Sequence, residues 1–325
     1  MSQAVSTLKC SVIMTAKNEE RHIRAAISSI LAQSLPDFEL IVMDDRSVDR
    51  TVEIVRDMAR EDPRITLLCA SGSGRVACLN AALACARAPY VAIMDADDLA
   101  NPERLALQVR YLDLNPNVVA VGGAVSYLAA SETMIPAPDG RKVTQKPARP
   151  QSRLEGIVFK PLPIMHSAAM MRLDAVREVG GYREALRHQE DTDLFLRLEE
   201  IGEVHNLPEV LHYYRQHQNN TSRRHMVAQC ASRQLALALA RRRRLGMNDW
   251  AYEHGRAASW ALLLLRDPLL AARATLGTVL LVMRHGRKRR KLRRSLEKAA
   301  QAVVEDRERQ LNGASKVMPR AKEAA

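Results

Sequence analysis

The residues whose types and spacing suit chemistry form three clusters of carboxylates. The first cluster, Asp95, Asp97 and Asp98, lies in YVAIMDADDLANPERL, directly after an apolar run. In an extended segment residues i and i+2 point to the same side, so Asp95 and Asp97 share a side. Clustered carboxylate oxygens suit Mg²⁺ or Mn²⁺, with substrate phosphates completing the coordination shell. The alternative is a loop in which Asp98 or Asn101 caps a helix that starts at Pro102.

The second cluster is the pair Asp44 and Asp45, which follows the apolar run FELIVM. Two adjacent charges at the end of a buried strand cost free energy unless they are paired or bind a ligand rich in hydrogen-bond donors. A carboxylate here can accept hydrogen bonds from a nucleobase N–H or a ribose hydroxyl. Asp49, a little further on, has the simpler interpretation of an N-cap for the next helix.

The third cluster, Glu190, Asp191 and Asp193, lies at the start of an amphipathic segment. Negative charge at a helix N-terminus stabilises the helix dipole, and this alternative explains one or two of the carboxylates. All three together, in a chain that carries the other two clusters, also offer a general base.

A glycine-containing segment, SGSGR at 71–75, lies between a predicted strand and a predicted helix. Free backbone N–H groups at such a point attract phosphate. The segment has neither the complete P-loop pattern nor the G-x-G-x-x-G fingerprint. We interpret it as a turn that makes Arg75 a candidate diphosphate contact.

The elements that must position these clusters alternate between strand and helix patterns. Alternation of this kind predicts a parallel sheet with helices on both faces, and ligands bind at the carboxyl ends of its strands. The stretch 129–152 predicts loops and edge strands. Apolar runs predict strands at 9–15, 38–43, 64–69, 90–94, 118–122 and 166–171, and helical spacing predicts helices at 19–34, 49–60, 75–87, 102–114, 172–179 and 190–202.

The C-terminal region differs from the rest in charge. Residues 225–325 hold 22 Lys/Arg and 8 Asp/Glu, a net charge of +14, so residues 1–224 sum to −2 of the total of +12. This distribution argues against a nucleic-acid partner. Beyond 225 the patterns are helical, and the apolar stretches are followed by a basic run at 284–294. Such a region fits attachment to an anionic membrane surface, and the alternative is helices packed on the preceding domain with a solvated basic end.

The location that the sequence predicts is the cytoplasm, with attachment to the inner face of the cell membrane as a further expectation. The five cysteines form no C-x-x-C pair, which fits buried thiols in a reducing compartment. The N-terminus shows no secretory signal pattern. The apolar stretches 257–265 and 274–283 are shorter than the roughly 20 residues that span a bilayer.

Six segments, in order, resemble family 2 glycosyltransferases of the GT-A fold. They lie within residues 9–222 and are SVIMTAKNEE, SSILAQSLPDFELIVMDDRSVDRT, YVAIMDADD, PIMHSAAMMR, VGGYREALRHQEDTDLFLRL and YYRQHQNNTS. The resemblance implies an α/β fold with a Rossmann-like, mostly parallel sheet flanked by helices and a C-terminal helical extension. Together with the change of charge and pattern near 225, it leads us to expect a catalytic domain at 1–224 and a basic helical region at 225–325.

The resemblance implies a donor site at the strand ends. Thr15 and Asp45 match the positions that hold the nucleotide's base and ribose, with Asn18, Glu19 and Asp44 nearby. His166 matches a histidine of the family, for which a satisfied, semi-buried histidine is the alternative. The further residues expected to contact the nucleotide sugar are Arg75, Asp95, Ala96, His166 and Glu190.

The resemblance also implies a metal site and a catalytic base. Asp95 and Asp97 match the ends of the family's D-x-D motif, and with Asp98 they should face a divalent metal and the sugar nucleotide diphosphate. Asp191, the second residue of the family's E-D pair, matches the catalytic base. The ligands expected for Mn²⁺ or Mg²⁺ are Asp97, Asp98 and His217, with Arg215 assisting.

The implied reaction is an inverting transfer of sugar from a nucleotide-diphosphate sugar, with a UDP-sugar favoured, to a saccharide or lipid-linked acceptor in cell-surface polysaccharide or glycolipid synthesis. Two alternatives stay open. A non-catalytic sugar-nucleotide-binding protein would not need Asp191, and a nucleotidyltransferase would be expected to have a glycine-rich loop where this chain has TAKNEER. Two departures from the family, Arg46 in place of glycine and Lys17 in place of an aromatic residue, blur the choice of nucleotide.

Overall fold

The first half of the fold alternates strand and helix as predicted. A computed structural model of the chain describes residues 8–70, 74–128, 164–186, 188–216 and 226–246. The β-branched and apolar runs form strands that are buried on both faces, which is the setting of a parallel sheet. The elements are β1 (Cys10–Ala16), α1 (Ile23–Leu31), β2 (Phe38–Asp44), α2 (Thr51–Glu61), β3 (Ile65–Cys69), α3 (Arg75–Cys85) and β4 (Tyr90–Asp95).

The second half departs from the prediction in its strands, and two of these, β5 (Leu99–Ala100) and β8 (Glu203–Arg215), were not predicted at all. The strand predicted at 166–171 is wrong in its first part, because residues His166–Ala168 form a 3-10 turn, η1, and the strand starts only at Met170. The predicted strand at 118–122 continues to Leu128. The elements are β5 (Leu99–Ala100), α4 (Arg104–Leu114), β6 (Val118–Leu128), β7 (Met170–Arg172), α5 (Leu173–Glu178), the 3-10 turn η2 (Glu184–Leu186), α6 (Glu190–Leu198), β8 (Glu203–Arg215) and α8 (Met226–Arg244).

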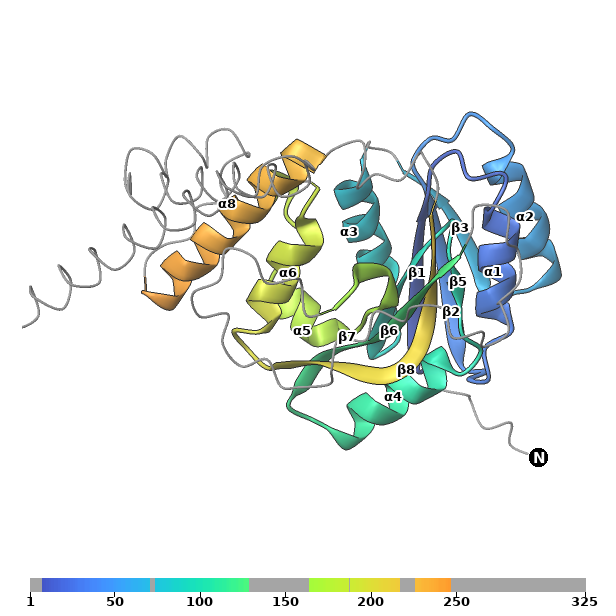
Figure 1. Cartoon of the computed structure of the whole chain (residues 1–325). Helices are drawn as coiled ribbons and strands as arrows, with labels where there is room; N and C mark the ends of the chain where they lie inside the picture. The colour runs from blue at the N-terminus through green and yellow to red at the C-terminus, as the bar shows by residue number, and fades with distance from the viewer. Residues whose placement is uncertain (1–7, 71–73, 129–163, 187, 217–225, 247–325) are drawn as a thin grey trace, which may run out of the picture.

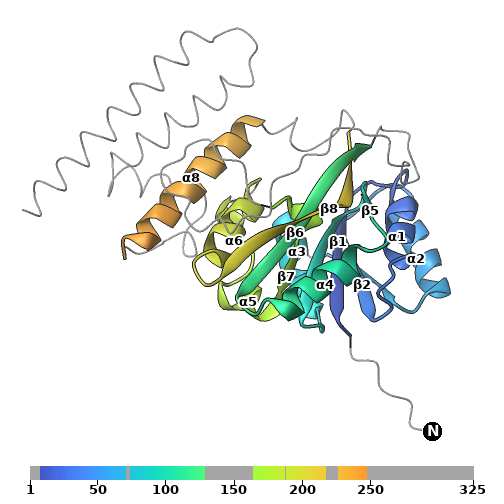
Figure 2. The same cartoon turned by 60° about the horizontal axis from the view of Figure 1, so that its bottom comes forward.

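A single sheet holds the described strands together, in the order β3-β2-β1-β4-β7-β6-β8-β5. The first four strands in this order are parallel, and β6 and β8 are also parallel, while β7 and β5 run antiparallel to their neighbours. Figures 1 and 2 show the sheet between its helices. The prediction of a mostly parallel α/β sheet is confirmed, with a mixed half that the sequence did not indicate.

Two apolar layers fix the sheet between its helices. One layer packs α1, α2 and α4 on one face, through residues such as Ile27, Val55 and Leu105. The other packs α3, α5 and α6 on the opposite face, through residues such as Leu79 and Phe195. Because helices cover both faces, the carboxyl ends of the strands are the part of the sheet that is open to a ligand.

The helix α8 packs against α6, as Figure 1 shows. Leu196 of α6 and Leu235 and Leu239 of α8 are buried, together with Leu186 of η2, in a separate apolar cluster. The predicted helical pattern after 225 is thus confirmed for α8, which packs on α6 and η2. None of the helices in this described part of the chain is long and apolar enough to cross a bilayer. The stretches 129–152, 257–265, 274–283 and 284–294 lie outside the described residues.

Candidate active site

The strand ends bring the first two acidic clusters to one edge of the sheet. In the parallel register Thr15 of β1 lies opposite Asp95 of β4, and Ala16 of β1 lies opposite Asp44 of β2. Asp44 and Asp45 are buried, and Thr15 is partly exposed beside them. The structure therefore places these predicted donor-site residues together, as the sheet rule requires.

Asp45 is held by two donors. The backbone N–H of Gly74 donates to its Oδ1 at 3.1 Å, and the Lys17 ammonium donates to its Oδ2 at 3.1 Å. Asp44 accepts the backbone N–H of Ser47 at 2.9 Å with Oδ2, while its buried Oδ1 has no partner among the described residues. The turn before α3 thus contacts the aspartate pair through Gly74, and Lys17 contacts it from the loop after β1.

The loops after β1 and β2 are joined to each other. Asn18 accepts the backbone N–H of Val48 at 2.9 Å with its side-chain oxygen, and the backbone N–H of Glu19 donates to the Thr51 hydroxyl at 2.8 Å. Asp49 accepts the backbone N–H of Thr51, the first residue of α2, at 3.0 Å, but the N-cap of α2 is Arg50, so the prediction of Asp49 as N-cap is wrong by one residue. The side chain of Asn18 therefore stabilises the loop after β2, and its backbone lies beside the donor-site residues.

Arg46 takes the backbone conformation that glycine favours. Its φ is 57°, in the left-handed region, and its side chain is exposed. The turn after the aspartate pair is therefore left-handed even though the residue is arginine, and the departure from glycine places a basic side chain on the surface of this loop.

The oxygens of Asp95, Asp97 and Asp98 lie within 4.8 Å of one another. Burial, and then the negative charges of Asp97, Asp49 and Asp95, raise the pKa of Glu19 to about 8. Oxygen ligands at this spacing, in an environment with excess negative charge, fit a divalent cation such as Mg²⁺ or Mn²⁺. The cluster predicted from D-A-D-D is thus present in space.

Both carboxylate oxygens of Asp98 have partners in the protein. His212 Nε2 lies 2.7 Å from Oδ2, and the backbone N–H of Arg215 donates to Oδ1 at 2.7 Å. The Arg215 guanidinium also donates to the backbone oxygen of Asp97 at 2.5 Å. Burial and the charges of Asp97 and Asp95 raise the pKa of Asp98 well above its ordinary value. These contacts attach the acidic loop to β8, the strand that leads toward His217.

Arg75, the first residue of α3, connects the acidic clusters. Its Nη2 lies 2.6 Å from Asp95 Oδ1, and its Nε lies 3.5 Å from Glu190 Oε1. The same Nη2 lies 3.3 Å from His166 Nδ1. Burial alone would raise the pKa of Asp95, but the charge and hydrogen bond of Arg75 outweigh burial and lower it. One guanidinium thus spans the D-x-D segment and the E-D segment.

His166 is a buried, hydrogen-bonded histidine. Its Nε2 lies 2.7 Å from the hydroxyl oxygen of Tyr182, and its Nδ1 faces Arg75. Burial and the charge of Arg75 lower the pKa of His166 to about 3, so the imidazole is neutral. Tyr182 was not predicted from the sequence. The only pattern that marks it is its place after Gly180-Gly181, just before the third acidic cluster.

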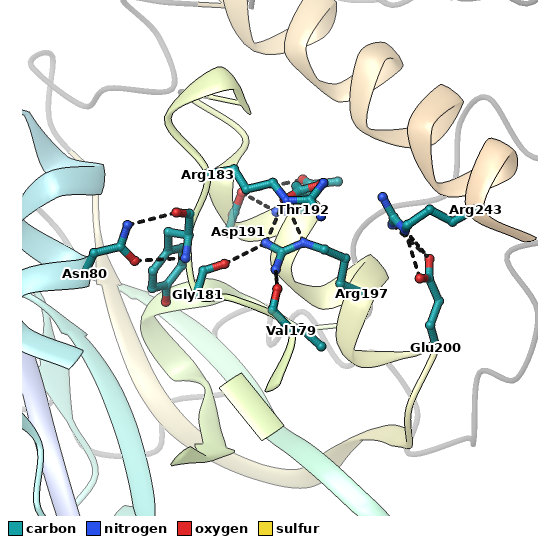
Figure 3. A network of polar contacts seen from close by, with 11 residues as sticks. Asn80, Val179, Gly181, Arg183, Asp191, Thr192, Arg197, Glu200 and Arg243 are labelled. Atoms are coloured by element: carbon teal, nitrogen blue, oxygen red, sulfur yellow. Dashed lines mark hydrogen bonds and ion pairs between the residues drawn. The ribbon is translucent and has the colours of Figure 1, made fainter. Parts of the chain in front are cut away.

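The third cluster divides into two roles. Asp193 is fully buried and pairs with Arg197 at 2.7 Å and with Arg183 at 3.5 Å, so its charge holds α6 in place. Asp191 accepts the backbone N–H of Thr192 at 2.7 Å and the Thr192 hydroxyl at 3.5 Å (Figure 3). Burial, and then the charge of Glu190, raise the pKa of Asp191 to about 6. A carboxylate with such a pKa is suited to accept a proton near neutral pH.

Two predicted residues need separate mention. Ala96 is buried between Asp95 and Asp97 in the acidic loop. His217 lies outside the described residues. The structure thus brings together Thr15, Asn18, Glu19, Asp44, Asp45, Arg75, Asp95, Ala96, Asp97, Asp98, His166, Glu190 and Asp191.

Solved structures share this architecture at low sequence identity. Staphylococcus aureus TarS 1-349 in complex with UDP-GlcNAc superposes with a TM-score of 0.55 at 18% identity, over 85% of this chain and 82% of that chain. The mannosyltransferase PcManGT from Pyrobaculum calidifontis, in complex with GDP-Man and Mn²⁺, gives a TM-score of 0.52 at 19% identity, over 92% of this chain and 81% of that one. The shared fold is the GT-A glycosyltransferase fold.

Sequence comparisons point the same way. The protein EpsE of Bacillus subtilis (strain 168), named as a glycosyltransferase, is 35% identical over 249 residues, which are 75% of this chain and 86% of that protein. The amylovoran biosynthesis glycosyltransferase AmsE of Erwinia amylovora is 28% identical over 205 residues, 62% of this chain and 74% of that one. The family model described as glycosyl transferase family 2 matches residues 11–180. The chain, with its acidic strand ends on a GT-A sheet, therefore belongs to glycosyltransferase family 2.

Proposed function

We propose that this glycosyltransferase moves a sugar from a nucleotide-diphosphate sugar to a hydroxyl of a saccharide or lipid-linked acceptor, with inversion at the anomeric carbon. The observation that carries the proposal is the position of Arg75, which lies 2.6 Å from Asp95 and 3.5 Å from Glu190. Asp95 belongs to the predicted donor segment, and Glu190 directly precedes the predicted base. Because one guanidinium contacts both carboxylates, the proposed donor segment and the proposed base lie close to each other.

Asp191 acts as the general base in this proposal. It takes the proton of the acceptor hydroxyl while that oxygen forms a bond to the anomeric carbon. The bond from this carbon to the diphosphate breaks in the same displacement, and the nucleoside diphosphate leaves with the electron pair. The pKa of about 6 leaves most of the Asp191 carboxyl ionised at neutral pH and still basic enough to accept the proton.

The donor nucleotide binds, in this proposal, at the ends of β1 and β2. Asp45 and Asp44 accept hydrogen bonds from the base and ribose, with Thr15 beside them. Arg75 meets the diphosphate, where its positive charge is matched to the phosphate oxygens. The likeness to TarS in complex with UDP-GlcNAc supports a UDP-sugar as the favoured donor.

A divalent cation completes the donor site. Asp97 is the first choice as ligand, and Asp98 and His217 remain further proposed ligands, with Asp95 orienting the sugar or ribose. A bound Mn²⁺ or Mg²⁺ would supply positive charge that offsets the charge of the departing diphosphate. The neighbour that binds Mn²⁺ together with GDP-Man supports this assignment.

A glycan acceptor fits the relative AmsE, which is named for the biosynthesis of amylovoran. We place the reaction in cell-surface polysaccharide or glycolipid synthesis on the cytoplasmic side of the membrane.

The eight basic residues within 284–294 would attach the enzyme to anionic lipid, at about 1 kcal/mol for each residue near the surface. Replacing all eight by glutamine should abolish co-sedimentation with phosphatidylglycerol vesicles. Equal sedimentation of the parent and this variant would exclude attachment by this run.

The proposal is tested by titrating UDP-, GDP- and TDP-sugars into the protein with and without Mn²⁺, and by assaying transfer with the donors that raise the unfolding temperature. We expect a UDP-sugar to give the largest shift, and only with the metal. Asp97→Ala should remove the metal dependence of donor binding. Equal nucleotide affinity with and without Mn²⁺ in the parent would contradict the metal assignment, and binding without transfer would favour a non-catalytic binding protein.

A further inference from the structure

Behind Arg75 lies a chain of hydrogen bonds that reaches Tyr182. An arginine can only donate hydrogen bonds, so the contact of Arg75 Nη2 with His166 Nδ1 at 3.3 Å makes Nδ1 the acceptor. The proton of the neutral imidazole is then on Nε2, which lies 2.7 Å from the Tyr182 oxygen and donates to it. Arg75 thus selects the tautomer, and the tyrosine oxygen accepts the Nε2–H and holds the ring with its Nδ1 lone pair toward Arg75.

Tyr182 is itself held from two sides. Asn80 of α3 donates to the Tyr182 backbone oxygen at 2.8 Å and accepts its backbone N–H at 2.9 Å. Arg197 of α6 donates to the backbone oxygens of Val179 and, at 2.7 Å, Gly181. Figure 3 shows Asn80 and Arg197 on either side of Gly181. The tyrosine is therefore tied to α3, which begins with Arg75, and to α6, which begins with Glu190.

The backbone of this turn requires its glycines. Gly180 and Gly181 have φ of 80° and 64°, where a side chain is strained, and this pair turns the chain from α5 toward Tyr182. The ring of Tyr182 is 3% exposed and meets the His166 ring edge to face at 5.5 Å between centroids. Neither ring has room to leave its partner, so the hydrogen bond between them is kept by packing as well as by polarity.

We propose that Tyr182 is a positioning residue for the transfer reaction, which acts through His166 to hold the Arg75 guanidinium between Asp95 and Glu190. This inference rests on the proposed function, because it assigns Arg75 a place beside the donor diphosphate. Without the tyrosine oxygen, the Nε2–H of His166 loses its acceptor, and the ring is no longer held with Nδ1 toward Arg75. Only the two carboxylate contacts, to Asp95 and Glu190, then fix the position of the guanidinium.

The test compares Tyr182→Phe with a matched control in the full-length protein. Tyr111 of α4 makes the same kind of contact with His205 of β8, with 2.8 Å between Tyr111 Oη and His205 Nδ1 and 5.9 Å between ring centroids. Tyr111→Phe therefore removes an equivalent tyrosine–histidine hydrogen bond away from Arg75. We expect Tyr182→Phe to lower kcat/KM for the donor by about 10-fold to 100-fold, and Tyr111→Phe to leave it within about two-fold.

The split between kcat and KM separates positioning from a general loss of structure. Charge on the diphosphate grows as the glycosidic bond breaks, so a misplaced Arg75 should cost more in kcat than in donor KM. Unfolding temperatures of both phenylalanine variants show whether folding is equally affected. Two results would overturn the proposal. One is an equal loss of kcat/KM in both variants, and the other is a loss of kcat/KM in Tyr182→Phe that only matches the loss of folded protein.

A double-mutant cycle tests the route through Arg75. The variant Arg75→Lys has no guanidinium for the Tyr182 hydroxyl to position. Adding Tyr182→Phe to it should therefore change kcat/KM by less than about two-fold. The variant His166→Asn keeps an acceptor for Arg75 but breaks the hydrogen bond to Tyr182. Adding Tyr182→Phe to this variant should also leave kcat/KM nearly unchanged. Losses that multiply in both backgrounds would show that Tyr182 acts on its own and would overturn the proposal.

Failure of this inference is distinct from failure of the proposed function. If the parent transfers sugar and Tyr182→Phe matches the parent, the positioning role is wrong while the function stands. If the parent transfers no sugar from any donor in the panel, the proposed function is wrong and the positioning role falls with it.

Discussion

The carboxyl groups of Asp95 and Asp191 lie at the same end of the sheet, but their neighbours shift their pKa in opposite directions. Asp95 is buried, yet the charge of Arg75 keeps its pKa below the ordinary value. Burial and the charge of Glu190 raise the pKa of Asp191 to about 6. Acidic groups whose environments separate their pKa in this way take different roles in catalysis. Asp95 stays charged as a partner for cations, and Asp191 is the group that can gain a proton.

The first prediction concerns the dependence of transfer on pH. A base works only when deprotonated, so kcat/KM should rise with pH through an acidic limb near pH 6, the pKa of Asp191. Because the Glu190 charge contributes to this pKa, Glu190→Gln should move the limb to lower pH. The measurement is a pH profile of kcat/KM at saturating Mn²⁺ for both proteins. A limb that stays in place, or moves to higher pH, would contradict the influence of Glu190.

At this scale the sequence predicts the acidic residues but not their partners. Asp45, Asp95 and Asp191 were found because each follows a strand or opens a helix in a recognisable motif. Tyr182 and His212 were missed, since a single tyrosine after two glycines and a single histidine within a polar strand form no pattern. Their roles depend on contacts with residues far away in the chain, His166 and Asp98.

Among the elements, α6 carries the E-D pair and is fixed by charge as well as by apolar packing. Asp193 and Arg197 are both buried, and Arg197 also donates to the backbone of the turn before Tyr182. The α6 N-terminus is therefore set relative to α5 and α3 by hydrogen bonds that cross between elements. Such a connection is suited to keeping Asp191 in place while substrates enter and leave.

The second prediction is that Arg197→Met strongly destabilises the protein. Removing Arg197 leaves the buried Asp193 charge with only the more distant Arg183, at 3.5 Å, and breaking a buried ion pair costs up to about 3–5 kcal/mol of unfolding free energy. The matched control is Arg60→Met, because Arg60 forms an exposed pair with Asp57 on α2. Urea unfolding of both variants measures the difference. Equal midpoints for Arg197→Met and Arg60→Met would show that the buried pair does not fix α6.

The elements themselves were predicted where their apolar spacing is regular. The strands β1, β2 and β4 and the helices between them appear within a few residues of the predicted bounds. The strand β8 was missed because its sequence, EVHNLPEVLHYYR, mixes charged residues and a proline with apolar ones. The strand β5 has two residues, too few for any periodicity. The strand β8 forms because it pairs with β6 and β5, and β5 forms because it pairs with β8; these are tertiary contacts.

For the whole molecule, the first helix of the basic region is part of the catalytic body. Leu235 and Leu239 of α8 pack on Leu186 and Leu196, and Arg243 pairs with Glu200 at 2.8 Å. The division at 224 and 225, proposed from charge, therefore separates two regions that share an apolar cluster. The abrupt change in charge marks a change in sequence pattern but not the end of the folded unit.

The third prediction follows from this shared cluster. Leu239→Ala removes a fully buried side chain, which costs about 2–5 kcal/mol when it leaves a cavity. The matched control is Leu114→Ala at the end of α4, where the leucine is 70% exposed. The melting temperature of the catalytic domain, followed with a bound donor, should fall for Leu239→Ala and stay nearly constant for Leu114→Ala. An unchanged melting temperature in Leu239→Ala would show that α8 is energetically independent.

The most direct test of a transfer site with Asp191 as its base is the variant Asp191→Asn, which keeps the shape of the side chain and removes its basicity. With the preferred donor and Mn²⁺, we expect the rate of sugar transfer to fall by about 10²–10⁴-fold. The affinity for the nucleoside diphosphate, measured by calorimetry, should stay within about two-fold of the parent, because Asp191 meets the acceptor rather than the nucleotide. Transfer by Asp191→Asn at the parent rate would contradict the assignment of Asp191 as the base.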